Sequence, residues 1–185
     1  MNIKTANTLL TLALAATVGL TGCCKKKACN NASQQQPAPV AETTADDPSV
    51  ISFTMADMDG NMVDVKQVFA KSRITIVDFW ASWCGPCRNE MPVLVELYSQ
   101  YHDKGLGILG VSLDEDRQQW TDATKQLGIT WPQVSDLQGW DNAAAVKYGV
   151  RGIPFAVIVD SEGKILKAGL RGDELKAFVA ETLAK

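Results

Sequence analysis

Two cysteines three residues apart stand at the junction of two segments with different patterns. Cys84 and Cys87 follow the near-continuous apolar run Ile74–Trp80, which is typical of a central strand covered on both faces. They also lie at the start of a second segment, because apolar side chains recur at helical spacing over residues 86–101. A buried strand that leads at once into a helix restricts this chain to an α/β architecture.

The pattern after residue 50 alternates strands with helices. Asp59-Gly60 predicts a hairpin turn between strands at 51–56 and 62–65. We expect further elements in this order: a buried strand at 106–113, helices at 116–127 (capped by Asp116) and 141–148, a hairpin of 155–159 with 164–168, and a closing helix that buries Leu175, Phe178, Val179 and Leu183. This order predicts a central mixed β-sheet flanked by helices on both faces.

Residues 1–22 have the form of an export signal. Lys4 precedes an apolar stretch, about residues 9–20, that is shorter than a membrane-spanning helix. The stretch ends in Leu20-Thr21-Gly22-Cys23, which resembles the bacterial lipobox, whose cysteine is lipidated and begins the mature protein. By this resemblance Cys23 carries the acyl chains of a lipid anchor. The alternative is an ordinary signal peptide with a coincidental cysteine.

Residues 23–48 are predicted to be the lipid anchor and a flexible tether. They are rich in Asn, Gln, Pro and Thr and hold almost no large apolar side chains, so they cannot bury enough surface to offset their ordering entropy. Cys24 and Cys29 lie here. They could pair with each other, or Cys24 could simply accompany the anchor. We expect the folded domain to span residues 49–185.

Two classes of site are disfavoured by composition. The formal net charge is −3 and the only dense basic run is Lys25–Lys27, which argues against a nucleic-acid-binding surface. A structural zinc ion would need two ligands besides Cys84 and Cys87. The chain has one histidine, His102, and its other cysteines lie in the tether. We therefore expect no metal.

The position of the cysteine pair favours redox chemistry instead. Unpaired N–H groups and the positive end of the helix dipole at a helix N-terminus stabilise a thiolate. Cys84, the first of the pair, should be the exposed nucleophile. Cys87 lies one turn further along, close enough to resolve a mixed disulfide. Pro86 suits the first helical turn because its missing N–H costs little there. The Cys84–Cys87 disulfide would be the redox centre, and no cofactor is expected.

The segment around these cysteines, Asp78-Phe79-Trp80-Ala81-Ser82-Trp83-Cys84-Gly85-Pro86-Cys87-Arg88, resembles the active site of the thioredoxin superfamily. The following Asn89-Glu90-Met91-Pro92, the extra helix before Gly152-Ile153-Pro154, and Val159-Asp160-Ser161-Glu162-Gly163 resemble its TlpA/ResA branch, the membrane-anchored thioredoxins of bacterial envelopes. The resemblance covers about residue 49 to the C-terminus. It implies a thioredoxin fold with an N-terminal β-hairpin and an inserted helix.

Site roles follow from the same resemblance. Pro154 matches the cis-proline that faces the cysteines, which implies that the backbone of Ile153 pairs with substrate. Asp78 matches the buried acid behind the cysteines, where burial should raise its pKa and let it exchange a proton with Cys87.

Trp83, Gly85 and Pro86 are expected to form the surface that substrate contacts. Trp80 could belong to this surface or to the core. Glu90 could add to the electric field of the site or lie on a solvated helix face. The strand at 106–113 lacks the lysine that thioredoxins pair with the buried acid.

The resemblance implies a lipid-anchored thiol-disulfide oxidoreductase that faces the periplasm and acts on protein disulfides. Gly85-Pro86 matches the reducing thioredoxins, so a disulfide reductase is the leading hypothesis. Its implied electron donor is a membrane thiol carrier of the DsbD/CcdA type. Its client could be an apocytochrome c in cytochrome c maturation, an oxidatively damaged protein, or another oxidoreductase.

Three alternatives remain open. A disulfide oxidase or isomerase would share the fold. A peroxidase of the related peroxiredoxin family would carry a threonine two or three residues before its reactive cysteine, whereas Ala81, Ser82 and Trp83 precede Cys84. The last alternative is a non-catalytic binding module.

Overall fold

A five-stranded mixed sheet forms the centre of the computed structural model, which describes residues 47–184. The strand order is β5-β4-β3-β6-β7, and the strands are β3 (Ile74–Trp80), β4 (Leu106–Ser112), β5 (Gln133–Val134), β6 (Phe155–Asp160) and β7 (Ile165–Ala168). Strand β4 is parallel to β3 and to β5, whereas β6 is antiparallel to β3 and β7. The predicted mixed sheet is confirmed.

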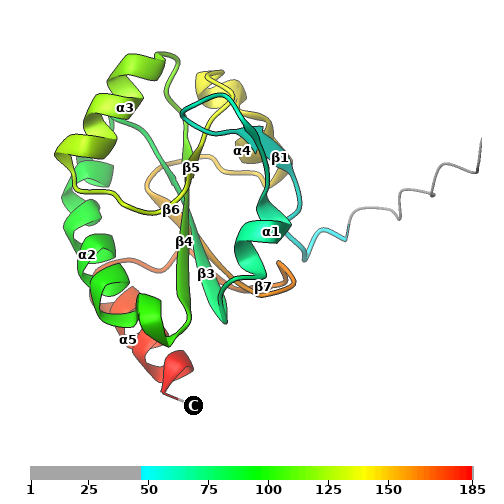
Figure 1. The fold of residues 1–185 in the computed structure, drawn as a ribbon, viewed down its shortest axis with the longest axis vertical. Coiled ribbons are helices and arrows are strands. Elements are labelled where there is room, and N and C mark those ends of the chain that lie inside the picture. The colour runs from blue at the N-terminus through cyan, green and yellow to red at the C-terminus, as the bar shows by residue number, and fades with distance from the viewer. Residues whose placement is uncertain (1–46, 185) are drawn as a thin grey trace, which may run out of the picture. The chain divides into compact units, whose positions relative to one another are not determined.

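Helices cover both faces of this sheet. The larger helices are α2 (Gly85–Tyr101), α3 (Arg117–Gln126) and α5 (Gly172–Leu183); the short ones are α1 (Val65–Phe69) and α4 (Ala143–Lys147), with 3₁₀ turns at His102–Lys104 (η1) and Gly139–Asp141 (η2). Figure 1 shows α2, α3 and α5 on one side of the sheet and α1 and α4 on the other. Two successive right-handed crossovers in the same direction place α2 and α3 on one face.

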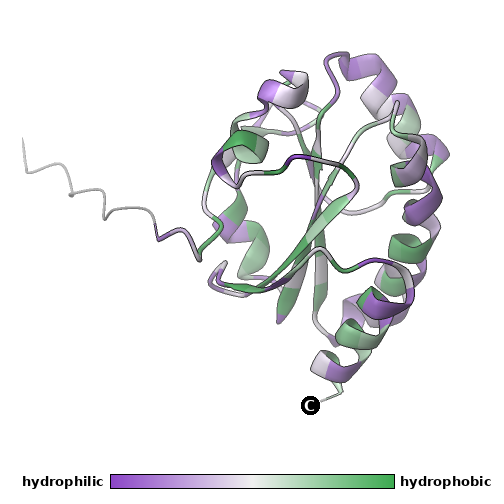
Figure 2. Cartoon of the chain, turned by 180° about the vertical axis from the view of Figure 1, so that it is seen from behind, coloured by the Kyte–Doolittle hydropathy of each residue, from purple (hydrophilic) through white to green (hydrophobic). Residues whose placement is uncertain are grey.

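Strand β3 is the most enclosed element, and all seven of its residues are buried. It has a neighbouring strand on each side and helices above and below, which accounts for its continuous apolar sequence. Figure 2 shows the central strands as hydrophobic, while the helices carry hydrophilic residues along part of their surface. Leu175, Val179 and Leu183 are buried on α5, as predicted, and Phe178 is partly buried.

Trp80, at the end of β3, is a core residue. It is fully buried, and its indole Nε1 donates to Gln133 Oε1 on β5 at 2.9 Å. The side chain of Gln133 passes over Gly110 of the intervening strand, where a Cβ atom would lie 2.2 Å from it. A side chain at 110 would therefore have to displace the Gln133 side chain from this position. Of the two alternatives for Trp80, the structure selects the core.

The predicted N-terminal hairpin is present but shorter than expected. Strands β1 (Thr54–Ala56) and β2 (Met62–Asp64) pair antiparallel around a turn that contains Gly60 at φ 90°. Val65 was predicted to end the second strand, and this was wrong. The side chain of Asp64 accepts the N–H of Lys66 and so caps helix α1, which begins at Val65.

Other boundaries also differ from the prediction. The helix expected at 141–148 is divided into η2 and α4, because the buried Asn142 side chain accepts the N–H groups of Ala144 and Ala145 and starts a new helix. The helix expected at 116–127 is confirmed as α3, with Asp116 as its N-cap.

The predicted signal peptide (residues 1–22), Cys23, Cys24, Cys29 and nearly all of the tether lie outside the described residues. Between residues 47 and 184, no helix has the length and apolar character that crossing a membrane would need.

Candidate active site

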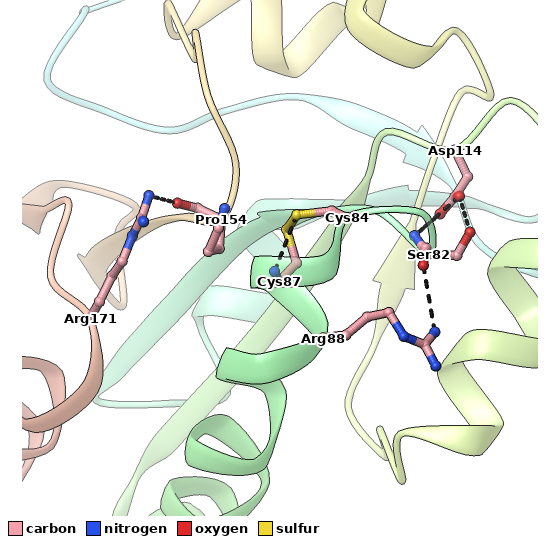
Figure 3. The surroundings of a disulfide bond; sticks show 7 residues. All are labelled: Ser82, Cys84, Cys87, Arg88, Asp114, Pro154 and Arg171. Atoms are coloured by element: carbon pink, nitrogen blue, oxygen red, sulfur yellow. Dashed lines mark hydrogen bonds between the residues drawn. A yellow bond between two sulfur atoms is a disulfide. The ribbon is translucent and has the colours of Figure 1, made fainter.

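The two cysteines lie at the start of α2 and form a disulfide. Cys84 is the N-cap residue, with extended backbone angles of φ −83° and ψ 100°. Its Sγ accepts the backbone N–H of Cys87 at 3.2 Å and is bonded to the Sγ of Cys87 (Figure 3). Pro86 lies in the first turn, as expected from its missing N–H. The sulfur of Cys84 therefore faces the unpaired N–H groups of a helix N-terminus.

Exposure around the disulfide differs from the prediction. Cys84 was expected to be exposed, but only 5% of its surface is accessible in this oxidised state, against 1% for Cys87. The bond to Cys87 covers part of the Cys84 sulfur, and the residue sits where a buried strand meets a helix. The accessible surface belongs instead to its neighbours Trp83, which is 52% exposed, Gly85 and Pro86. These three residues form the accessible surface next to the disulfide.

The loop before β6 lies beside the disulfide. The Ile153–Pro154 peptide bond is cis, and Pro154 lies next to the two sulfurs (Figure 3). The N–H and C=O of Ile153 make no hydrogen bond to any other residue in the range 47–184. Arg171, just before α5, donates from its guanidinium to the carbonyl of Pro154. The loop is therefore tied to α5 while the backbone of Ile153 stays unpaired.

Asp78, in the middle of β3, is buried with 3% of its surface exposed. Burial raises its pKa from 3.8 to about 7, the negative charge of Glu90 adds to this, and the positive charge of Arg171 opposes it. The expected raised pKa is confirmed. Arg171 is thus the positively charged residue that acts on Asp78. Sequence reasoning missed it because Arg171 belongs to no motif and approaches only in the folded chain.

Glu90, on α2, does more than line a solvated helix face. It is partly buried, and its Oε1 accepts the backbone N–H of Gly172 at 2.6 Å, at the first residue of α5. This contact holds the carboxylate within electrostatic reach of Asp78. Of the two alternatives for Glu90, the structure supports a contribution to the field of the site.

A second buried acid, Asp114, fixes the segment before the cysteines. It lies just after β4, with 1% of its surface exposed. Its carboxylate accepts the N–H of Ser82 at 3.0 Å and the hydroxyl of Ser82 (Figure 3). It also accepts the hydroxyl of Ser112 at 2.7 Å. These bonds join the end of β3 to the end of β4 and so position Cys84. Nothing in the sequence pattern pointed to Asp114.

Within residues 47–184, no group of three or more His, Cys, Asp or Glu side chains is placed to hold a metal ion.

A mixed sheet that leads into a helix capped by a Cys-x-x-Cys disulfide, beside a cis-proline, defines a thiol-disulfide oxidoreductase of the thioredoxin superfamily. Comparison with known proteins agrees. The family model described as Redoxin matches residues 34–182, and the chain belongs to this family. The match begins inside the segment that the sequence predicted as a tether.

Individual relatives point the same way. The chain is 30% identical over 134 residues to the thiol-disulfide oxidoreductase ResA of Bacillus thuringiensis, covering 72% of this chain and 74% of that protein. A solved thiol-disulfide oxidoreductase from Bacteroides fragilis is 30% identical with a TM-score of 0.67, over 72% of this chain and 98% of that one.

The thioredoxin domain of an oxidoreductase from Bacteroides vulgatus is 33% identical with a TM-score of 0.66, over 76% and 99%. The predicted thioredoxin fold and the likeness to the TlpA/ResA branch are confirmed.

Proposed function

We propose that this protein is a periplasmic disulfide reductase, in which Cys84 attacks client disulfides and Cys87 releases the product. One observation carries the proposal. Cys84 is the N-cap of α2, and its sulfur receives the N–H of Cys87. After reduction of the disulfide, the same helix terminus would stabilise the Cys84 thiolate over the thiol.

The proposed reaction has two exchange steps. The Cys84 thiolate attacks one client sulfur, so a Cys84–client disulfide forms, the client disulfide breaks and a client thiolate leaves. Cys87 then loses its proton to the Asp78 carboxylate and attacks the Cys84 sulfur. The Cys84–Cys87 disulfide forms and the second client thiolate leaves. The client gains two electrons, which the cysteine pair loses.

Asp78 suits the role of proton acceptor. Its pKa of about 7 means that it is present in both protonation states near neutral pH. It can accept the proton of Cys87 when the mixed disulfide is resolved, and return it when the pair is reduced again. With 3% of its surface exposed, Asp78 would keep that exchange away from bulk water.

Client binding is proposed at Ile153. The N–H and C=O of this residue have no partner among residues 47–184, and the neighbouring Pro154 lies beside the sulfurs (Figure 3). An extended client segment could pair with them as an added strand. Such pairing would hold the client backbone without restricting its sequence.

The cysteine pair must be reduced again after each turnover, which in an oxidising compartment requires electrons from elsewhere. We propose a membrane thiol carrier of the DsbD/CcdA type as donor, and a lipid anchor at Cys23 that holds the domain to the membrane. The form of residues 1–23 supports the anchor. Clients would be proteins with accessible disulfides, including apocytochromes c.

The direction of transfer is tested by the reduction potential. A reduction potential of about −270 mV would support a reductase, and one of about −120 mV would support an oxidase. Gly85-Pro86 between the cysteines supports the reducing direction by its resemblance to reducing thioredoxins.

Clients are identified by trapping. In a Cys87→Ser variant the second step cannot occur, so Cys84 should remain bonded to its clients in cells. These adducts would disappear on reduction and be absent from a Cys84→Ser/Cys87→Ser double variant. If Cys84→Ser retained full biological activity, the protein would act as a binding module and the proposal would be wrong.

The anchor is tested separately. Cys23→Ser should abolish incorporation of a fatty-acid label and release the protein from the membrane fraction, whereas Cys24→Ser should change neither. Equal labelling of the two variants would contradict lipidation at Cys23.

A further inference from the structure

A cleft beyond Trp83 takes no part in the reaction proposed above. Its volume is about 330 Å³, and it is lined by Trp83, Asp114, Glu115, Asp116, Gln119, Gly139 and Trp140. Figure 3 shows Asp114 on the opposite side of the disulfide from Pro154. A client paired at Ile153 could therefore cross the disulfide and place a side chain in this cleft.

Two exposed indole rings form its outer wall. Trp83 is 52% exposed and Trp140 is 48% exposed. Their ring centroids lie 6.3 Å apart, with the planes tilted by 53°. Trp83 precedes Cys84, while Trp140 belongs to η2, far along the chain. The fold thus brings two large aromatic surfaces together beside the reactive sulfur and leaves both open to solvent.

Three of the remaining lining residues are acidic, and the other two are Gln119 and Gly139. The carboxylate of Asp114 is held by Ser82 and Ser112. That of Asp116 caps α3 by accepting the N–H of Gln119 at 2.8 Å. The carboxylate of Glu115 packs against Gly139, where a Cβ atom would lie 2.5 Å from its Oε1. The exposed Glu115 side chain therefore lies beside η2, the element that carries Trp140.

These acidic charges are not neutralised by a neighbouring base. No Lys or Arg side chain lines the cleft, and no salt bridge within residues 47–184 involves any of the three acids. Arg88 is directed at the carbonyl of Ser82, with an N–O distance of 3.5 Å, and Arg117 donates to the carbonyl of Met58 at 2.7 Å. The partial positive charge at the N-terminus of α3 offsets about half of one charge. The cleft is aromatic and negatively charged.

We propose that this cleft binds a lysine or arginine side chain that lies close to the disulfide of the client protein. The proposal rests on the function proposed above and adds a preference among its clients. A cation over an indole face is attracted by the ring quadrupole, and the acidic residues add Coulomb attraction and repel acidic side chains. The backbone contact at Ile153 would hold any extended client, while the cleft selects basic ones.

The test compares two peptides that differ only in charge. Each carries one cysteine as a mixed disulfide with thionitrobenzoate, and either arginine or its neutral isostere citrulline next to that cysteine. The full-length protein with Cys87→Ser, and with Cys23, Cys24 and Cys29 also replaced by serine, is reduced beforehand. Its Cys84 then attacks the peptide sulfur and releases thionitrobenzoate, which is followed by absorbance. We expect the arginine peptide to react about three to ten times faster at low ionic strength. This advantage should shrink in about 0.5 M salt, because the higher ionic strength screens the attraction between exposed charges.

Variants locate the source of that preference. Glu115→Gln and Trp140→Leu should each lower the ratio of the two rates, and the double variant should bring it close to one. Glu162→Gln removes an exposed acid in the turn between β6 and β7 and should leave the ratio unchanged. If Trp140→Leu does not fold by circular dichroism, Trp140→Phe keeps a ring and should lower the ratio less.

The outcomes separate the two proposals. Equal rates for both peptides, with thionitrobenzoate released from each, would overturn the basic subsite and leave the exchange reaction intact. A ratio that survives the double variant would also overturn it, because the preference would arise elsewhere. Release from neither peptide would overturn the subsite together with the proposed function.

Discussion

At the scale of single residues, two charges of opposite sign act on the pKa of Asp78. Glu90 on α2 raises its pKa and Arg171, before α5, lowers it, while burial is the largest effect. Each of these charged residues also makes a hydrogen bond that involves the start of α5. Glu90 accepts the N–H of Gly172, and Arg171 donates to the carbonyl of Pro154. The protonation of the buried acid is thus coupled to the position of α5.

Replacing Asp78 by asparagine should stabilise the oxidised protein at alkaline pH. The folded pKa, about 7, lies above the unfolded value near 3.8, so the stability that this group contributes is fully present below pH 3.8 and is lost as the pH rises through 7. A raise of about three pKa units corresponds to at most about 4 kcal/mol. Denaturant unfolding at pH 5 and pH 8 measures this. A variant that loses stability equally at both pH values would contradict the assignment.

Glu90→Gln and Arg171→Gln should shift the pKa of Asp78 in opposite directions. Removing the negative charge of Glu90 should lower that pKa, and removing the positive charge of Arg171 should raise it. In the proposed reaction Asp78 accepts the proton of Cys87 and must be ionised to do so, so the rate of mixed-disulfide resolution should rise with pH through this pKa. Rapid-mixing measurements across pH would show the two shifts. Glu174→Gln, at an exposed position of α5, is the control; shifts in the same direction would refute this account.

At the scale of the secondary structure, a short helix can depend on one polar side chain for its stability. Helix α4 has five residues, too few to be stable by itself in water. Asn142 is fully buried; its Oδ1 accepts the N–H groups of Ala144 and Ala145, and its Nδ2 donates to Asp136 at 2.7 Å. This side chain starts α4, while the backbone N–H of Asn142 caps the end of η2, the element that carries Trp140.

Asn142→Ala should therefore lower the free energy of unfolding by about 2 to 3 kcal/mol, because it removes the cap and leaves buried polar groups without partners. Gln100→Ala removes an exposed bond to Glu96 on α2 and should cost less than about 0.5 kcal/mol. Urea denaturation followed by far-UV circular dichroism compares the two. Similar losses would show that Asn142 does not have this structural role.

Prediction of the elements succeeded where the sequence pattern was long. Strand β3 and helices α2 and α5 each bury a regular set of apolar side chains, so their period could be seen without the fold. Helix α1 and strand β5 were missed. They contain five and two residues, which is too short for a period to be visible.

At the scale of the whole domain, a side-chain hydrogen bond connects two strands of the sheet that are not neighbours. Trp80 on β3 and Gln133 on β5 are joined across Gly110 of β4. The intervening strand must come close to the bridging side chain, and it can do so only because it lacks a Cβ atom there.

Gly110→Ala should accordingly destabilise the domain by about 2 kcal/mol or more, since a Cβ atom 2.2 Å from Gln133 must displace that side chain and its bond to Trp80. Gly152→Ala, where a Cβ atom would meet nothing within 4 Å, is the matched control. Thermal unfolding measures both. Equal melting temperatures for the two variants would mean that Gln133 can move aside without cost.

The sequence by itself determined the mixed sheet, the helix that Cys84 caps and the buried place of Asp78, because each depends on local periodicity or on a motif contiguous in the chain. Only the tertiary structure decided that Arg171 and Glu90 act on Asp78, that Asp114 anchors Ser82, and that Trp140 joins Trp83. Such contacts unite residues from separate loops and helix ends. Their positions are set by how the elements pack on the sheet, and no pattern along the chain records that packing.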